Sequence, residues 1–155
     1  ASADLIGSCA MSCARAVALL TLTLAACSNP ERDELLNWLD DYEAERAGAR
    51  VSLCVCPELL GYASSDECEA DAPSVGASEK ECIADVFEGN EDLGIDYYSC
   101  VTPLLRTYDL CLIDSSGECF PDWDEPCTSD YEAALAQCPT LSSSKAAAVF
   151  DCVSG

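Results

Sequence analysis

Cysteine thiols are the side chains whose number and spacing most clearly indicate chemistry in this chain. There are 13 of them in 155 residues, about 8%, a level typical of a disulfide scaffold in a short secreted chain. Zinc is the competing use of many cysteines. However, no pair has the two-residue gap of zinc knuckles, and the chain contains no histidine. Because the cytosol keeps thiols reduced, the sequence predicts an extracytoplasmic location, at the cell envelope or outer surface.

A second suggestive stretch, residues 11–27, ends in a cysteine. It reads MSCARAVALLTLTLAAC, with Arg15 near its start, an apolar run at 16–24 and small residues before Cys27. A basic head, an apolar middle and a small-residue site are typical of a secretory signal, and the run is shorter than the roughly 20 residues that span a bilayer. The closing Leu-Ala-Ala-Cys resembles the lipobox of bacterial lipoproteins. That resemblance implies cleavage before Cys27 and a diacylglycerol on its thiol.

The parity of the cysteines agrees with such processing. Cleavage before Cys27 removes Cys9 and Cys13, and lipid occupies the thiol of Cys27 itself. An even set of ten then remains, which can form five disulfides without leaving a free thiol, although the pairing cannot be deduced from sequence. The predicted disulfide cysteines are Cys54, Cys56, Cys68, Cys82, Cys100, Cys111, Cys119, Cys127, Cys138 and Cys152.

The same N-terminal residues also fit a retained hydrophobic helix. Residues 1–10 precede Met11, which a simple signal does not require, and Pro30 separates the apolar segment from an amphipathic one. A long helix broken at Pro30 resembles the N-terminal spine of type IV pilin-like subunits in its architecture, although Leu5 stands where such pilins carry a glutamate. Residues 1–27 are therefore interpreted either as a lipobox signal or as a retained anchor helix.

The charge balance excludes several kinds of partner. The chain has 29 acidic and 7 basic residues, a net charge of −22. Such a surface repels nucleic acid, because binding requires Lys and Arg to displace counterions. It also disfavours docking on anionic lipid, so a membrane is reached only through lipid or a hydrophobic helix. Cations or basic partners fit the charge, but a solvated acidic shell is the favoured explanation.

The sequence contains no recognisable catalytic constellation. Without histidine there is no Ser–His triad and no attached c-type haem, and no carboxylate pair stands out from the other acids. Weak calcium candidates are the oxygen ligands of Asn90, Asp92 and Asp96, with residues 122–125 as a second group. Their spacing departs from an EF-hand loop, because Ile95 stands where glycine is required. We predict no enzymatic activity and no cofactor.

The segments that follow the leader have mainly helical periodicity. Apolar residues spaced by three and four predict a helix at 31–47 that ends at Gly48. Alternating residues at 51–56 predict a short extended segment. Cys54 and Cys56 cannot easily bond to each other there, so we expect each to pair with a different element.

Two more helices are expected in the middle of the chain. A polar loop at 64–77 is followed by a capping box that starts at Ser78 and opens a helix at 79–88. The next helix, at 92–112, contains Pro103, which should kink or restart it. Its two cysteines lie about three turns apart on one face, so we expect them to staple both ends of the helix to its neighbours.

The C-terminal part is expected to contain two short helices. After a loop at 113–128, a second capping box starting at Ser129 opens a helix at 130–138. The last helix, at 144–152, is expected to turn Val149, Phe150 and Cys152 inward.

These features predict a mainly α fold. A small disulfide-rich domain at 28–155, with four to five short helices and at most one short strand pair, follows an N-terminal hydrophobic helix at 1–27. The best-fitting function is a non-enzymatic envelope or surface protein, lipid-anchored at Cys27, with a structural or interaction role. One alternative keeps 1–27 as a transmembrane or assembly helix, in a subunit of an extracellular filament or membrane complex that binds protein partners or copies of itself. Another is a small carrier of lipid or another hydrophobic ligand, as in elicitin-like folds, whose cysteine spacing differs.

Overall fold

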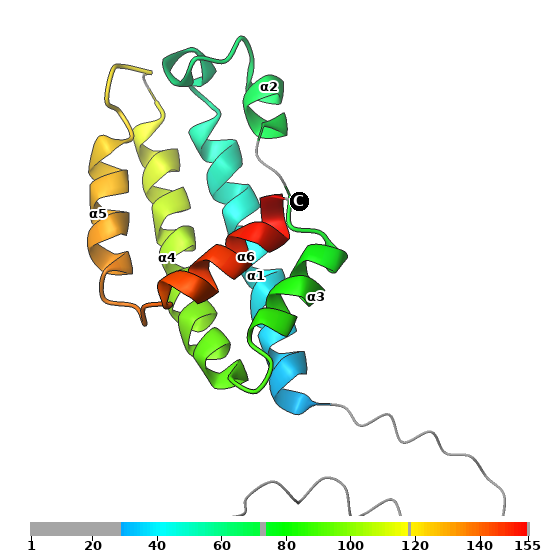
Figure 1. Cartoon of the computed structure of the whole chain (residues 1–155). Helices are drawn as coiled ribbons and strands as arrows, with labels where there is room; N and C mark the ends of the chain where they lie inside the picture. Colours follow the sequence, from blue (N-terminus) through cyan, green and yellow to red (C-terminus); the bar gives the residue numbers. More distant parts are fainter. Residues whose placement is uncertain (1–28, 72–73, 118, 155) are drawn as a thin grey trace, which may run out of the picture.

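The computed structural model describes residues 29–71, 74–117 and 119–154, and this part of the chain is helical without any strand (Figure 1). The predicted fold class, mainly α and disulfide-rich, is confirmed. The predictions for residues 1–27, including Cys27, lie outside the described residues. The helices are α1 (Pro30–Leu53), the 3₁₀ helix η1 (Pro57–Leu60), α2 (Ser65–Ala70), α3 (Ala77–Val86), α4 (Glu91–Ser115), α5 (Glu125–Leu135) and α6 (Ser143–Ser154). None of these helices is long and apolar enough to cross a membrane.

The two long helices, α1 and α4, lie side by side and run in the same direction (Figure 1). Their facing residues alternate between spacings of four and three, the pattern that aligns side chains along one seam of a parallel helix pair. In α1 the seam residues are Leu35, Leu39, Tyr42, Arg46, Ala49 and Leu53, and in α4 they are Gly94, Tyr98, Val101, Leu105, Tyr108 and Leu112.

The shorter helices cover this pair on different sides. α5 packs beside α4, α3 lies against the first half of α1, and α6 crosses over α3 in front of the pair (Figure 1). The buried side chains form three clusters along the seam. The largest contains Leu35, Leu39 and Phe87, another surrounds Trp123 and Leu112, and the smallest contains Val101 and Leu105. The core is therefore divided, which increases the importance of the covalent bridges.

All ten cysteines from Cys54 to Cys152 are joined in five disulfides, which indicate an oxidising, extracytoplasmic setting. As predicted, Cys54 and Cys56 lead to different elements, and the two cysteines of α4 attach it to the segments at both ends of α5. The pairs are Cys54–Cys68, Cys56–Cys119, Cys82–Cys152, Cys100–Cys138 and Cys111–Cys127.

The predicted end of the first helix was wrong. α1 does not stop at Gly48 but continues to Leu53, so the extended segment expected at 51–56 is half helix and half turn. The reason is the seam, because Ala49 and Leu53 continue the packing of α1 on α4. Gly48 is kept in the helix, where a Cβ would lie 3.5 Å from Asp109 of α4.

Two other predicted boundaries were also wrong. The loop at 64–77 contains α2, which Ser64 caps by accepting a hydrogen bond from Glu67 N at 3.2 Å. The capping box at Ser78 does not form, because α3 starts at Ala77 and the Ser78 hydroxyl donates to the Glu79 carboxylate instead. The cap at Ser64 therefore forms, whereas the pattern at Ser78 does not set the start of α3.

The later helices also differ from prediction. α4 continues through Pro103, which is exposed, without a restart. α5 starts at Glu125, inside the expected loop, so Ser129 lies within the helix and does not cap it. Phe150 of α6 is 64% exposed and not turned inward. Val149 and Cys152 do face the core, where they are partly buried against its largest cluster, although no residue of α6 is fully buried.

Candidate functional site

The end of the bundle at which α1 begins is fixed by the side chain of Asn29. Its Oδ1 accepts hydrogen bonds from the backbone N–H groups of Glu31 and Arg32, and its Nδ2 donates to the Glu91 carboxylate at 2.9 Å. Glu91 is buried at the start of α4, and hydrogen bonds from its own backbone N–H and from Asn29 hold the pKa of this carboxyl below its usual range. One side chain thus joins the first turns of α1 and α4, two residues after Cys27.

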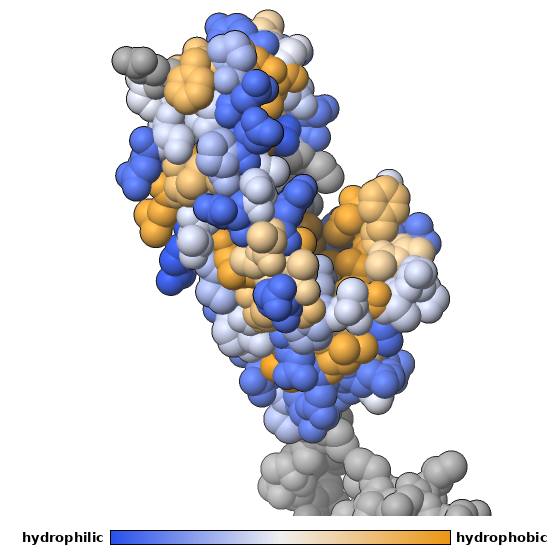
Figure 2. Space-filling model, turned by 90° about the vertical axis from the view of Figure 1, so that its left-hand side faces the viewer, coloured by the Kyte–Doolittle hydropathy of each residue, from blue (hydrophilic) through white to orange (hydrophobic). Residues whose placement is uncertain are grey.

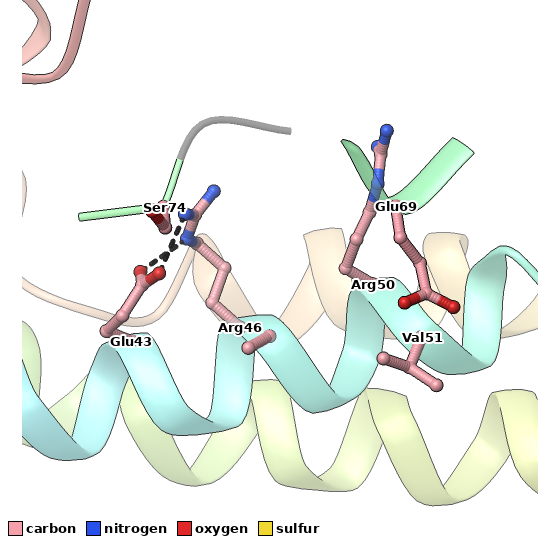
Figure 3. Close-up of a pocket in the computed structure, with 7 residues that line it drawn as sticks. Glu43, Arg46, Arg50, Val51, Glu69 and Ser74 are labelled. Carbon is pink, nitrogen blue, oxygen red and sulfur yellow. Dashed lines mark hydrogen bonds and ion pairs between the residues drawn. The ribbon is translucent and has the colours of Figure 1, made fainter. Parts of the chain in front are cut away.

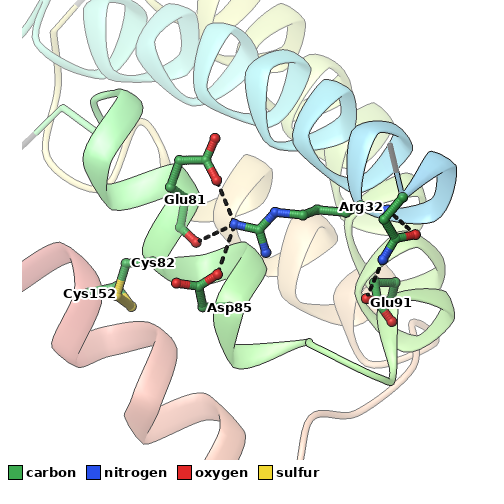
Figure 4. Close-up of polar contacts among 7 residues, drawn as sticks. Arg32, Glu81, Cys82, Asp85, Glu91 and Cys152 are labelled. Atoms are coloured by element: carbon green, nitrogen blue, oxygen red, sulfur yellow. Dashed lines mark hydrogen bonds and ion pairs between the residues drawn. A yellow bond between two sulfur atoms is a disulfide. The ribbon is translucent and has the colours of Figure 1, made fainter. Parts of the chain in front are cut away.

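Arg32 connects the same end of α1 to α3. Its guanidinium donates to the Glu81 carboxylate and lies 2.8 Å from the Asp85 carboxylate (Figure 4). The hydrogen bond to Glu81 is the main reason why the pKa of Arg32 is raised. The Cys82–Cys152 disulfide lies next to this group and attaches α6 to α3. The basic side chain here has a scaffolding role.

Three hollows meet at Arg46 in the middle of α1. The first, between α1 and α2, has a volume of about 170 Å³ and is lined by Arg46, Arg50 and Glu69 (Figure 3). The second reaches under α6 and has about 130 Å³, and the third follows the α1–α4 seam with about 190 Å³. We call this surface, formed by Tyr42, Arg46, Arg50, Tyr98 and Tyr108, the Arg46 groove.

Both arginines of the Arg46 groove are engaged by the scaffold. Arg46 binds the Glu43 carboxylate with two hydrogen bonds, of 2.8 and 3.1 Å, and the hydrogen bond to Glu43 is the main reason for its raised pKa (Figure 3). Glu43 also accepts a hydrogen bond from Val75 N at 3.0 Å, which attaches the segment before α3 to α1. Arg50 donates to the Cys68 carbonyl and lies over the Tyr62 ring.

Five of the six tyrosines gather along α1, α4 and α5. The ring of Tyr98 meets those of Tyr42 and Tyr97 edge-on at 5.2 and 5.1 Å, and Tyr108 lies 5.2 Å from Tyr131. Burial raises the pKa of Tyr42, Tyr97 and Tyr98, and that of Tyr131 to about 12. These phenols stay protonated at neutral pH. The groove therefore offers aromatic faces and hydrogen-bond donors, which suit binding rather than proton transfer.

Burial of these phenols predicts an alkaline loss of stability. The folded chain holds the phenol protons more tightly than the unfolded chain, whose tyrosine pKa is near 10. The stabilisation is thus fully present below about pH 10 and is lost as the pH rises through the folded pKa values. Denaturant unfolding across this range, followed with tyrosinate absorbance, should show the decline. The decline should be shallower in Tyr98→Phe, and an unchanged pH dependence in that variant would contradict the assignment.

The calcium candidates lie at the start of α4. Asn90 precedes the helix as its N-cap residue, whereas Asp92 and Asp96 lie in its first two turns. In the described ranges, no group of three or more His, Cys, Asp or Glu side chains is placed to hold a metal ion. The second predicted group, at 122–125, lines an open acidic hollow of about 550 Å³ together with residues of α5.

No protein-family model, curated protein or solved structure matches this chain.

Part of the site could be found from the sequence. Arg46 follows Leu35, Leu39 and Tyr42 at seam spacing, and that position signals a polar group among apolar ones. The approach of Arg50 to α2 carried no such signal, because it depends on the Cys54–Cys68 disulfide bringing α2 back to α1.

Proposed function

We propose that the protein is a non-enzymatic component of the cell envelope or surface, held to the membrane by lipid on Cys27. The observation that carries the proposal is the closed set of disulfides. All ten cysteines of the domain pair with one another, so none of them requires Cys27 as a partner. No disulfide of the domain therefore needs the thiol in the lipobox-like Leu-Ala-Ala-Cys, which supports lipid at this position together with the parity of the cysteines.

The short distance from Cys27 to the domain supports the same proposal. α1 starts at Pro30, so an extended linker spans only about 10 Å between the lipidated residue and the first turn. A bundle held this close presents its opposite end outward. Rigid cross-linked helices with raised phenol pKa values suit a structural or interaction role, whereas they place no reactive base or nucleophile.

The hollows do not favour the carrier alternative. Those of the Arg46 groove have volumes of about 130, 170 and 190 Å³. Ligand pockets usually occupy about 300–1,000 Å³, and a lipid chain needs an apolar cavity of that size. The larger hollow, of about 550 Å³, is lined by carboxylates and hydroxyls, which suit a polar ligand.

Lipidation is tested by replacing Cys27 in a bacterial host that processes lipoproteins. We expect the native chain to begin at Cys27 with acyl chains in its intact mass and to partition with membranes. Cys27→Ala should lose the lipid and appear in the soluble fraction, with the thermal midpoint of the domain unchanged, because Cys27 pairs with none of the ten domain cysteines. Reduction should add two hydrogens for each of the five disulfides in both proteins. A mature chain that keeps residues 1–26 and carries no lipid would contradict the proposal.

A further inference from the structure

The end of the bundle opposite Asn29 has an unusual charge. We call residues 51–71 and 107–132 the distal cap. It comprises the ends of α1 and α4, with η1, α2 and most of α5 (Figure 1). The two segments carry five and eight acidic residues and no Lys or Arg. In the sequence the basic residues all fall outside these two segments, at Arg15, Arg32, Arg46, Arg50, Lys80, Arg106 and Lys145. Of these, Arg50 reaches the edge of the cap, where it is engaged by the Cys68 carbonyl and the Tyr62 ring.

Most of the large apolar side chains that are exposed to solvent belong to the distal cap. Seven such side chains are exposed in the described part of the chain, and six of them belong to the cap. The six, which are 45–56% exposed, are Val51, Val55, Leu59, Leu110, Ile113 and Phe120. Figure 2 shows apolar side chains interspersed with hydrophilic ones at this upper end of the molecule. The Cys56–Cys119 disulfide brings Val55 and Phe120 together, since each adjoins one of its cysteines.

An acidic hollow lies next to Phe120 in the chain. It has a volume of about 550 Å³, and its carboxylates come from Asp122, Asp124, Glu125 and Glu132. Asp122 has a φ of 64°, a left-handed conformation that Asp tolerates. The turn buries Trp123 between Asp122 and Asp124, while both of these aspartates line the hollow. Since the described residues form no metal-binding group, these spread carboxylates suit the longer, organic cations of Lys and Arg.

The negative charge of the distal cap determines which class of partner can bind it. A second copy would bring two caps of the same sign together, and nucleic acid or anionic lipid is repelled for the same reason. Three of the five disulfides, Cys54–Cys68, Cys56–Cys119 and Cys111–Cys127, lie within the cap and hold it in shape before binding. Pre-organisation of this kind lowers the entropy cost of association.

We propose that the distal cap binds a basic, amphipathic polypeptide segment of a partner protein. The Lys and Arg side chains of that segment enter the acidic hollow, and its apolar side chains cover Val55 and Phe120. This inference rests on the interaction role proposed above and names the partner class. It places the binding surface at the end of the bundle farthest from the anchor.

The first test measures binding of a short amphipathic peptide built from Leu and Lys to the full, oxidised chain, by calorimetry at physiological salt. Phe120→Ser should weaken binding by about tenfold, the effect of losing one buried aromatic anchor. The matched control is Phe150→Ser, at 64% against 52% exposure, which lies on α6 and should leave affinity unchanged. Equal losses in both variants would overturn the proposal. If Phe120→Ser loses its helical signal, Val55→Ser replaces it with the same expectation.

The second test separates the acidic hollow from the overall charge. The double variant Asp124→Asn, Glu125→Gln should lower the affinity for the Leu–Lys peptide by about tenfold. It should also make this affinity less dependent on salt concentration. Asp33→Asn with Glu34→Gln removes the same charge from the start of α1 and should change affinity by less than about twofold. A peptide with Ser in place of Leu should bind weakly, and equal binding of both peptides would overturn the proposal. Because the assay needs no lipid, failure here would leave the anchor at Cys27 standing.

Discussion

Reduction of the five disulfides is expected to unfold the domain at neutral pH. Each bridge typically contributes about 2–4 kcal/mol by restricting the unfolded chain, against a total stability of about 5–15 kcal/mol for an ordinary domain. Here the buried apolar residues form three separate clusters, and a net charge of −22 opposes compaction. We expect near-ultraviolet circular dichroism and the cooperative denaturant transition to disappear after treatment with dithiothreitol.

The five bridges should not contribute equally. Cys56 is fully buried beside Leu112 and Trp123, so the Cys56→Ala, Cys119→Ala double variant should lose about 2–5 kcal/mol of unfolding free energy. The matched control removes Cys82–Cys152, which attaches α6, a helix with no buried residue. The two bridges close loops of similar length, 63 and 70 residues, so the unfolded chain gains similar freedom in both variants. The Cys82–Cys152 variant should therefore lose less only by the buried contacts of Cys56, and its amide exchange should rise first in α6. A cooperative transition that survives full reduction would show that the apolar clusters suffice.

The helical class and the existence of the two long helices, though not their packing against each other, were predictable because they depend on periodicity. Seam positions recur every three and four residues in both α1 and α4, and this signal persists over six positions in each helix. The cysteine count likewise predicted five bridges without their pairing. These properties are encoded in many residues at once, so no single local pattern could override them.

The boundaries failed where one local pattern competed with packing. Alternating residues at 51–56 favour a strand, but α1 continues to Leu53, with Ala49 buried and Leu53 packed against the cluster around Leu112. The sequences that begin at Ser78 and Ser129 both match the capping-box motif. However, α3 and α5 each start before the serine that was expected to cap them. A cap contributes only about 1 kcal/mol, which is less than the packing of one additional turn.

The distal cap could not be predicted, although the two segments that form it are visible in the sequence. The absence of Lys and Arg from residues 51–79 and 107–144 can be read from the sequence. That these two segments form one end of the molecule depends on the parallel course of α1 and α4 and on the Cys56–Cys119 bridge. Sequence reasoning therefore treated the acids as a uniform shell, whereas the fold separates an anionic end from a mixed one.

The tight contact between Gly94 of α4 and Leu35 of α1 predicts a reversal in the effect of one substitution. Leu35 is fully buried against Gly94, and a Cβ at Gly94 would lie 2.9 Å from Leu35 Cδ1 and 3.0 Å from Phe87 Cγ. Leu35→Ala should therefore cost about 2–5 kcal/mol of unfolding free energy, as other buried truncations do. Gly94→Ala should also destabilise, because an overpacking cost of about 1–3 kcal/mol exceeds the gain of about 1 kcal/mol in helix propensity.

In the Leu35→Ala background, the effect of Gly94→Ala should change sign. The methyl group then enters the space that Leu35 vacates, and Phe87, whose Cγ lies 3.0 Å from that Cβ, can shift into the same space. The gain of about 1 kcal/mol in helix propensity then outweighs the remaining overpacking cost. Guanidinium denaturation of the four proteins of this double-mutant cycle measures the coupling between the two positions. Ser99→Ala, on a less buried part of α4, serves as the control and should give the same change with or without Leu35. Additive effects of Leu35→Ala and Gly94→Ala would mean that the two helices are farther apart at this level than the 2.9 Å approach requires.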